Sequence, residues 1–76
     1  MKREEIVSRR DDVMSGALVF AGTRVPVESL IAHLRAGDRL DDFLDGFPSV
    51  RREQAEAFLD LALSATHESW RDARAA

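Results

Sequence analysis

The stretch Gly22-Thr23-Arg24-Val25-Pro26-Val27 decides the fold of this chain, because it places a strand end, a turn and a helix start within six residues. Gly22 follows the apolar run of residues 17–20, and glycine readily adopts the positive φ that a sharp turn needs. Pro26 suits the first position of a helix, since its φ is already helical and its missing N–H would be unpaired there. Val25 precedes the proline and is therefore held extended. The stretch predicts a β arm that ends near Gly22 and a helix that begins at Pro26.

The residues before this stretch predict a short β arm or hairpin. Apolar residues at 6–7 and 17–20 flank a polar segment, and Gly16 is placed to close the turn between them. A two-stranded hairpin is marginally stable on its own. We therefore expect the arm to pack on the helices or to pair with a second chain. Residues 1–10 also contain good helix formers, and a helix there is the alternative.

The residues after the stretch predict three helices. The first runs over residues 26–36, with Gly37 as its C-terminal cap. The second begins with Asp38 as N-cap and is stopped by Gly46 and Pro48. The third begins with Ser49 as N-cap and runs at least to residue 64, and the tail, residues 67–76, either extends it or frays. The 3.6-residue period assigns its inward face to Ala55, Phe58, Leu59, Ala62, Leu63 and Thr66.

These elements predict a mainly α fold: a trihelical, homeodomain-like helix-turn-helix domain with a short N-terminal β arm. The arm covers residues 1–22, the trihelical domain residues 23–66 and the C-terminal tail residues 67–76, all within one domain. Two short helices and a longer third one also fit a plain three-helix bundle. Topology alone therefore favours DNA binding only modestly.

Composition narrows the class of protein. A chain of 76 residues buries only about 60% of its unfolded surface, so the core is small and a partner is the expected further source of stability. There is no cysteine, which excludes disulfides and thiolate chemistry. The formal charge of −3 lacks the broad basic surface of a typical nucleic-acid-binding protein. With no membrane-spanning run and no signal-peptide pattern, we expect a cytoplasmic protein.

The order of these motifs resembles domain-of-unknown-function family 433, a set of small prokaryotic proteins often classed as VapB-like antitoxins. The resemblance runs from about residue 6 to residue 63, and GTRVPV at 22–27 and FPSVRREQ at 47–54 are its most specific parts. It implies a homeodomain-like fold with an N-terminal β segment and a neighbouring toxin with a PIN-like nuclease fold. The chain departs from the family's glycine-lysine-proline run, having Gly16, Ala17 and Leu18 there. Any contact made by that lysine in relatives is not transferred to this chain.

The GTRVPV residues Gly22, Thr23, Arg24 and Pro26 are interpreted as a structural motif. The Arg24 guanidinium suits either a phosphate or a carboxylate. We favour an ion pair with an acidic residue of the second or third helix, since a turn-anchoring role explains the motif without a ligand. Thr23 is expected to act as a turn or capping hydroxyl.

The start of the third helix carries the candidate DNA contacts. If the helix enters the major groove, Arg51 and Arg52 reach base edges and Gln54 is placed to read adenine. The alternative is a solvated polar face. Acidic residues follow at Glu53, Glu56 and Asp60, and they would repel phosphates. DNA binding by a monomer is therefore expected to be weak.

The candidate partner-binding residues are Leu61, Ala65 and Trp70. Leu61 lies off the main apolar stripe of the third helix, on a second apolar line with Ala65, which burial against another chain would explain. Trp70 either docks on the chain's own core or is offered to a partner.

Catalytic residues are not expected, because no nucleophile, base and orienting group can be assembled. His33 and His67 lie outside any metal-ligand spacing, so no metal and no cofactor are expected. The sequence and its resemblance together predict a non-enzymatic, homodimeric antitoxin of a type II toxin–antitoxin pair. It would bind a PIN-like nuclease and also contact operator DNA. The alternatives are a stand-alone DNA-binding transcriptional regulator and a dimerising adaptor without a toxin.

Overall fold

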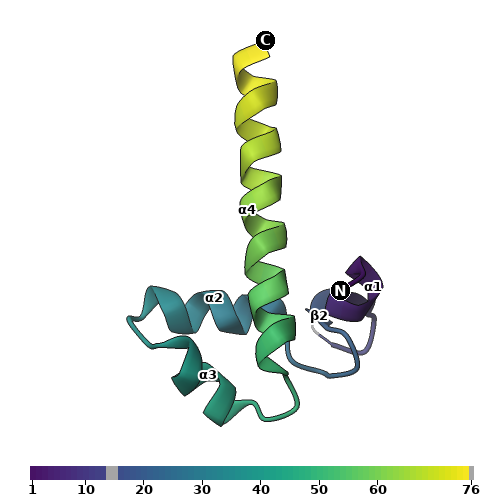
Figure 1. The fold of residues 1–76 in the computed structure, drawn as a ribbon. Helices are drawn as coiled ribbons and strands as arrows, with labels where there is room; N and C mark the ends of the chain where they lie inside the picture. The colour runs from purple at the N-terminus through teal and green to yellow at the C-terminus, as the bar shows by residue number, and fades with distance from the viewer. Residues whose placement is uncertain (14–15, 76) are drawn as a thin grey trace.

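The computed structural model describes residues 1–13 and 16–75, and it places side chains for the described residues up to 70. It is mainly helical, with four helices and one small antiparallel hairpin. In chain order the elements are α1 (Arg3–Ile6), β1 (Val7–Arg10), β2 (Ala17–Phe20), α2 (Val27–Arg35), α3 (Leu40–Gly46) and α4 (Arg52–Ala75). The hairpin lies on one side of the foot of α4, and α2 and α3 lie on the other (Figure 1).

The β arm pairs within one chain. β1 and β2 are antiparallel, with Val7 opposite Phe20 and Arg10 opposite Ala17. Gly16 has a φ of 90° just before β2, a conformation that a side chain would strain. The alternative of a helix over residues 1–10 holds only for the single turn of α1, because residues 7–10 form the strand.

One hydrophobic core joins the hairpin to the three longer helices. Its buried members are Phe20, Val27, Leu30, Phe43, Val50 and Ala55. The Phe20 ring from β2 lies against Phe43 of α3 and Phe58 of α4, at centroid distances of 6.1 and 5.7 Å. Half-buried side chains such as Leu34 and Leu59 surround this centre. The arm is thus an integral part of the core, as its marginal stability in isolation requires.

Pro26 flanks α2 without belonging to it. Its ψ of 141° is extended, and it pairs with Val19 as an isolated β-bridge, so the first helical residue is Val27. The prediction of Pro26 as the first helical residue was one position early. The physical reason is tertiary, because the Phe20 N–H donates to the Val25 carbonyl and draws this segment alongside β2.

The C-terminal end of α2 is a Schellman motif, which confirms Gly37 as its cap. Gly37 has a φ of 93°, its N–H donates to Leu34, and the Asp38 N–H donates to His33. Asp38 is not the N-cap of α3, because that position belongs to Arg39. The Asp38 carboxylate instead lies 2.9 Å from Nδ1 of His33.

Ser49 is not the N-cap of the last helix. It lies in a turn closed by the Val50 N–H on the Phe47 carbonyl, and α4 begins three residues later at Arg52. From there α4 continues to Ala75, so the tail extends the helix (Figure 1). Two residues assigned to its inward face, Leu63 and Thr66, are exposed, because the core reaches only the first half of the helix. No helix in the described part of the chain combines the length and apolarity needed to cross a membrane.

Candidate functional site

The GTRVPV stretch is a hydrogen-bonded joint between β2 and α2. Gly22 has a φ of 79°, as its place in the turn predicts. The Thr23 hydroxyl donates to the Phe20 carbonyl at 2.8 Å and accepts from the Val25 N–H at 3.0 Å. Thr23 is buried and its hydroxyl serves the turn, which confirms its expected role.

Arg24 forms an ion pair, but its partner lies in the hairpin. Its Nη1 is 2.6 Å from Oδ2 of Asp12, and its Nη2 reaches the Asp12 carbonyl. Arg10 holds the same carboxylate from the other side through Nε and Nη2, at 3.0 and 2.9 Å. The preference for an ion pair over a phosphate is thus supported, whereas the expected partner on the second or third helix is wrong. Asp12 ties the turn after β1 to the joint before α2.

The hydrogen bonds from Arg10 and then from Arg24 lower the pKa of Asp12 from 3.8 to about 2. A carboxylate with a lowered pKa in the folded chain contributes stability above its unfolded pKa, and that contribution is lost as pH falls toward 2. We expect an NMR titration of the Asp12 carboxyl carbon to have its midpoint near 2 in the native protein. In Arg24→Gln the midpoint should rise toward the ordinary value. An unchanged midpoint in that variant would show that the Arg24 contact is absent in solution.

Arg51 and Arg52 are exposed at the start of α4, and both lie beside acidic groups. Nη1 of Arg51 is 3.0 Å from Oε1 of Glu53. The Arg52 guanidinium pairs with Asp41 at the start of α3 and lies 3.5 Å from Glu56 on α4. The Arg52–Asp41 pair links α3 to α4. Together the three pairs neutralise much of the positive charge that a phosphate would meet.

Gln54 is not available to read a base. Its side chain is only 1% exposed. Nε2 donates to the carbonyls of Ala21, Ile6 and Glu5 at 2.9, 3.2 and 3.3 Å, and Oε1 accepts from the Arg51 N–H at 3.4 Å. The prediction of Gln54 as an adenine reader is therefore wrong, because the amide that would bind the base already ties α4 to the β arm.

Leu61 and Ala65 line an apolar groove between the hairpin and α4. The groove, which we call the hairpin groove, has a volume of about 390 Å³ and is lined by Arg3, Val7, Leu18, Phe58, Leu61, Ala62 and Ala65. Leu18 is 42% exposed at its edge. Leu61 is therefore partly covered by its own chain.

Trp70 lies on a different surface from Leu61. Trp70 is 67% exposed, and Leu63, about two helical turns before it, is 55% exposed. Seven residues separate these two, so they lie on one side of the helix, whereas the nine residues between Leu61 and Trp70 turn the helix by two and a half turns. We call Leu63 and Trp70 the distal ridge. The three predicted partner residues thus belong to two surfaces on opposite sides of α4.

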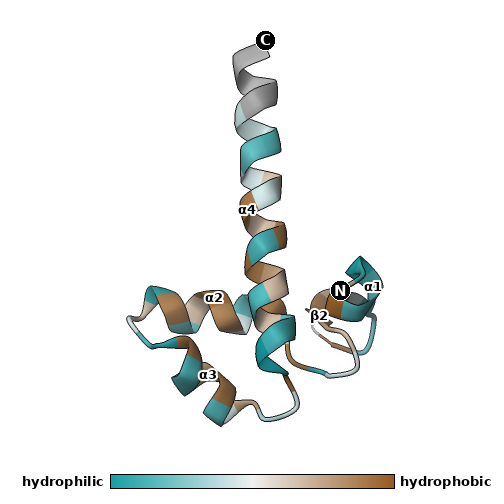
Figure 2. Ribbon diagram, in the orientation of Figure 1, coloured by the Kyte–Doolittle hydropathy of each residue, from teal (hydrophilic) through white to brown (hydrophobic). Residues whose placement is uncertain are grey.

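Figure 2 shows that hydrophobic residues continue along α4 beyond the level of α2. Sequence reasoning missed Leu18 and Leu63 as members of these exposed surfaces. The signal for Leu18 was available, since it alternates along β2 with the buried Val19 and therefore points to the other face of the hairpin. The exposure of Leu63 depends on where the core ends, which the helical period does not reveal.

Comparison with known proteins shows the family of the chain and a similar bacterial protein. The sequence model of the family described as "Protein of unknown function (DUF433)" matches residues 7–62. The chain is also similar to the "Uncharacterized protein y4eO" of Sinorhizobium fredii (strain NBRC 101917 / NGR234), with 38% identity over 50 residues. That match covers 66% of this chain and 23% of the relative, so the chain spans about a quarter of the length of that protein. No solved structure matches the chain significantly.

Proposed function

This chain belongs to the DUF433 family, and on that premise we propose that it is a binding module, the antitoxin half of a type II toxin–antitoxin pair. Its partner in this proposal is a PIN-like nuclease, neutralised by direct contact. One observation carries the proposal: the second half of α4 stands clear of the rest of the domain and presents the distal ridge (Figure 1). An exposed tryptophan on a protruding helix is the type of residue that anchors a protein interface.

The charge around the distal ridge supports a basic partner surface. Residues 53–70 contain four carboxylates and no lysine or arginine. Asp60 precedes Leu63 by three residues and therefore lies beside the ridge. An apolar ridge with an acidic flank fits a helix-in-groove contact whose groove has a basic rim. A nuclease that binds nucleic-acid phosphates would carry such a surface.

Operator contact is a secondary part of the proposal. The helices α2, α3 and α4 follow the order of a homeodomain-like helix-turn-helix, and Arg51 and Arg52 are exposed at the start of the helix that would enter the groove. With Gln54 buried, base contact is assigned to these two arginines alone. Since both are paired with carboxylates, operator binding requires those pairs to open. This favours the antitoxin over a stand-alone regulator.

Co-expression of the chain with the nuclease encoded next to it tests the proposal. We expect growth rescue and copurification of the two proteins. With a catalytically inactive nuclease, Trp70→Ala should weaken binding by about 30-fold or more, the effect of losing a tryptophan anchor of about 2 kcal/mol. The measurement is titration calorimetry on the purified proteins.

Leu63→Asp and Ser64→Asp form the matched pair for this experiment. Both add one negative charge to α4, but Ser64 lies about 100° around the helix from Leu63. Leu63→Asp should abolish capture and Ser64→Asp should leave it near the native affinity. Far-UV circular dichroism checks that each variant is folded. Nuclease that stays free beside the native chain would refute the proposal, as would native affinity in Trp70→Ala.

A further inference from the structure

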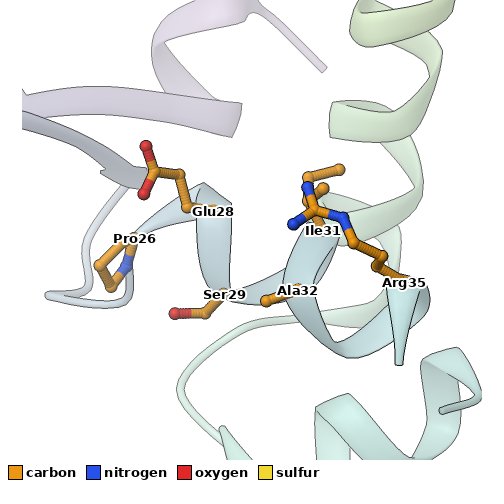
Figure 3. A pocket seen from close by; sticks show the side chains of 6 residues that line it. All are labelled: Pro26, Glu28, Ser29, Ile31, Ala32 and Arg35. Atoms are coloured by element: carbon orange, nitrogen blue, oxygen red, sulfur yellow. The ribbon is translucent and has the colours of Figure 1, made fainter. Parts of the chain in front are cut away.

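One exposed face of α2 carries opposite charges at its two ends. A shallow hollow of about 430 Å³ is lined by Pro26, Glu28, Ser29, Ile31, Ala32 and Arg35. Figure 3 shows Glu28 near one end of this face and Arg35 near the other. Positions 28, 31, 32 and 35 recur at the spacing of one helix side, and the core-facing residues Val27 and Leu30 lie away from them.

Neither charge at the ends of this face has a partner among the described side chains. The ion pairs of the described side chains all involve other residues. Glu28 and Arg35 cannot pair with each other, because seven residues of helix separate them by about 10 Å along the axis. The helix surface between these two charges is partly apolar, with Ala32 exposed and Ile31 half-buried.

We propose that this face of α2 is the contact between two copies of the chain, packed antiparallel about a two-fold axis that passes between Ile31 and Ala32. That axis places Glu28 of each copy opposite Arg35 of the other, so one arrangement satisfies all four charges. It also places Ile31 of each copy against Ala32 of the other, where the small Ala32 side chain makes room for Ile31. A two-fold contact of this kind requires a self-complementary surface, which this face provides.

A parallel arrangement of the same two helices is disfavoured. It would place Glu28 against Glu28 and Arg35 against Arg35, and like charges across an interface are repulsive. Since the face is only about two turns long, the contact falls below the area of a standard interface, and the dimer is weak and reversible. The inference gives a surface to the homodimer expected from the sequence, and it does not depend on the toxin, because Leu63 and Trp70 lie on α4.

Charge reversal tests this pairing by sedimentation equilibrium of the full chain at low and high salt. The native chain should self-associate with increasing concentration, and more weakly at high salt. Glu28→Arg and Arg35→Glu should each weaken self-association at low salt by about tenfold or more, because each places two like-charged pairs across the axis. An equimolar mixture of the two variants should restore association, since every pair across the axis is then of opposite charge.

Glu4→Arg is the matched control for Glu28→Arg. It makes the same change in net charge, but at an exposed residue of α1, and it should leave self-association unchanged. A native chain that stays monomeric at every concentration would overturn the inference. So would a mixture of the two variants that stays as dissociated as either alone. Because all of these variants keep the distal ridge, they should still capture the nuclease. A native chain that stays monomeric and yet captures the nuclease would overturn this inference and leave the toxin proposal standing.

Discussion

Phe20→Ala is expected to lower the free energy of unfolding by about 3–5 kcal/mol, the cost of removing a buried phenylalanine and leaving a cavity. Phe20 is fully buried and is the residue of the hairpin that contacts the aromatic rings of both α3 and α4. A chain of this length has a total stability of about 4–11 kcal/mol. The variant should therefore be largely unfolded at moderate urea concentrations where the native chain remains folded.

Urea denaturation followed by far-UV circular dichroism measures this effect. Leu18→Ala is the matched control, because Leu18 lies on the same strand but is 42% exposed at the hairpin groove. It should cost only about 1 kcal/mol, since a large part of the Leu18 surface stays in contact with water in the folded chain. Equal losses in the two variants would mean that the hairpin does not dock on the helices as the structure describes.

Gln54→Leu should lower the free energy of unfolding by about 2–3 kcal/mol, although leucine is similar in size and more apolar. The reason is the loss of the amide that serves the backbone carbonyls of Glu5, Ile6 and Ala21. A carbonyl that is buried without a hydrogen-bond donor has lost its hydrogen bonds to water and has no replacement. This lowers the free energy of unfolding by about 1–3 kcal/mol. Ile6 keeps one donor, the Ala21 N–H, which limits the total.

The same urea titration checks this effect, with Glu53→Leu as the control at the exposed neighbouring position. That control should change stability by no more than about 0.5 kcal/mol. Gln54→Glu adds a second test, because its carboxylate would face the same carbonyl oxygens and repel them. It should be less stable than Gln54→Leu at neutral pH and should recover stability on acidification. A Gln54→Leu chain as stable as the native one would show that the arm is not held by this amide.

Much of the fold was predictable because its elements carry local signals. The hairpin, the three longer helices, the turn at Gly22 and the cap at Gly37 all follow from residues within a few positions of each other. The errors at Pro26, Asp38 and Ser49 are shifts at element ends. At each of these ends a contact with a neighbouring segment, such as the bridge from Pro26 to Val19, decided which residue takes the cap.

The candidate sites were less predictable than the fold. Gln54 sits beside two exposed arginines in the sequence, and its helical position alone does not tell whether its amide meets DNA or the chain's own backbone. Trp70 is exposed, and the helical period alone does not reveal this, because it depends on how far the core extends along α4. The ion pair of Arg24 was expected, and only its partner was misplaced, because Asp12 lies 12 positions before Arg24 and meets it only when the hairpin folds.

The sequence by itself determined where the chain turns, where its helices lie and which faces are apolar, because backbone sterics and the helical period act over a few neighbouring residues. Only the tertiary structure decided which polar groups form hydrogen bonds within the chain and which surfaces remain exposed. Gln54 meets carbonyls up to 49 positions away, and the hairpin groove joins residues of α1, both strands and α4. Such contacts depend on segments that meet only when the core forms, so local pattern cannot specify them.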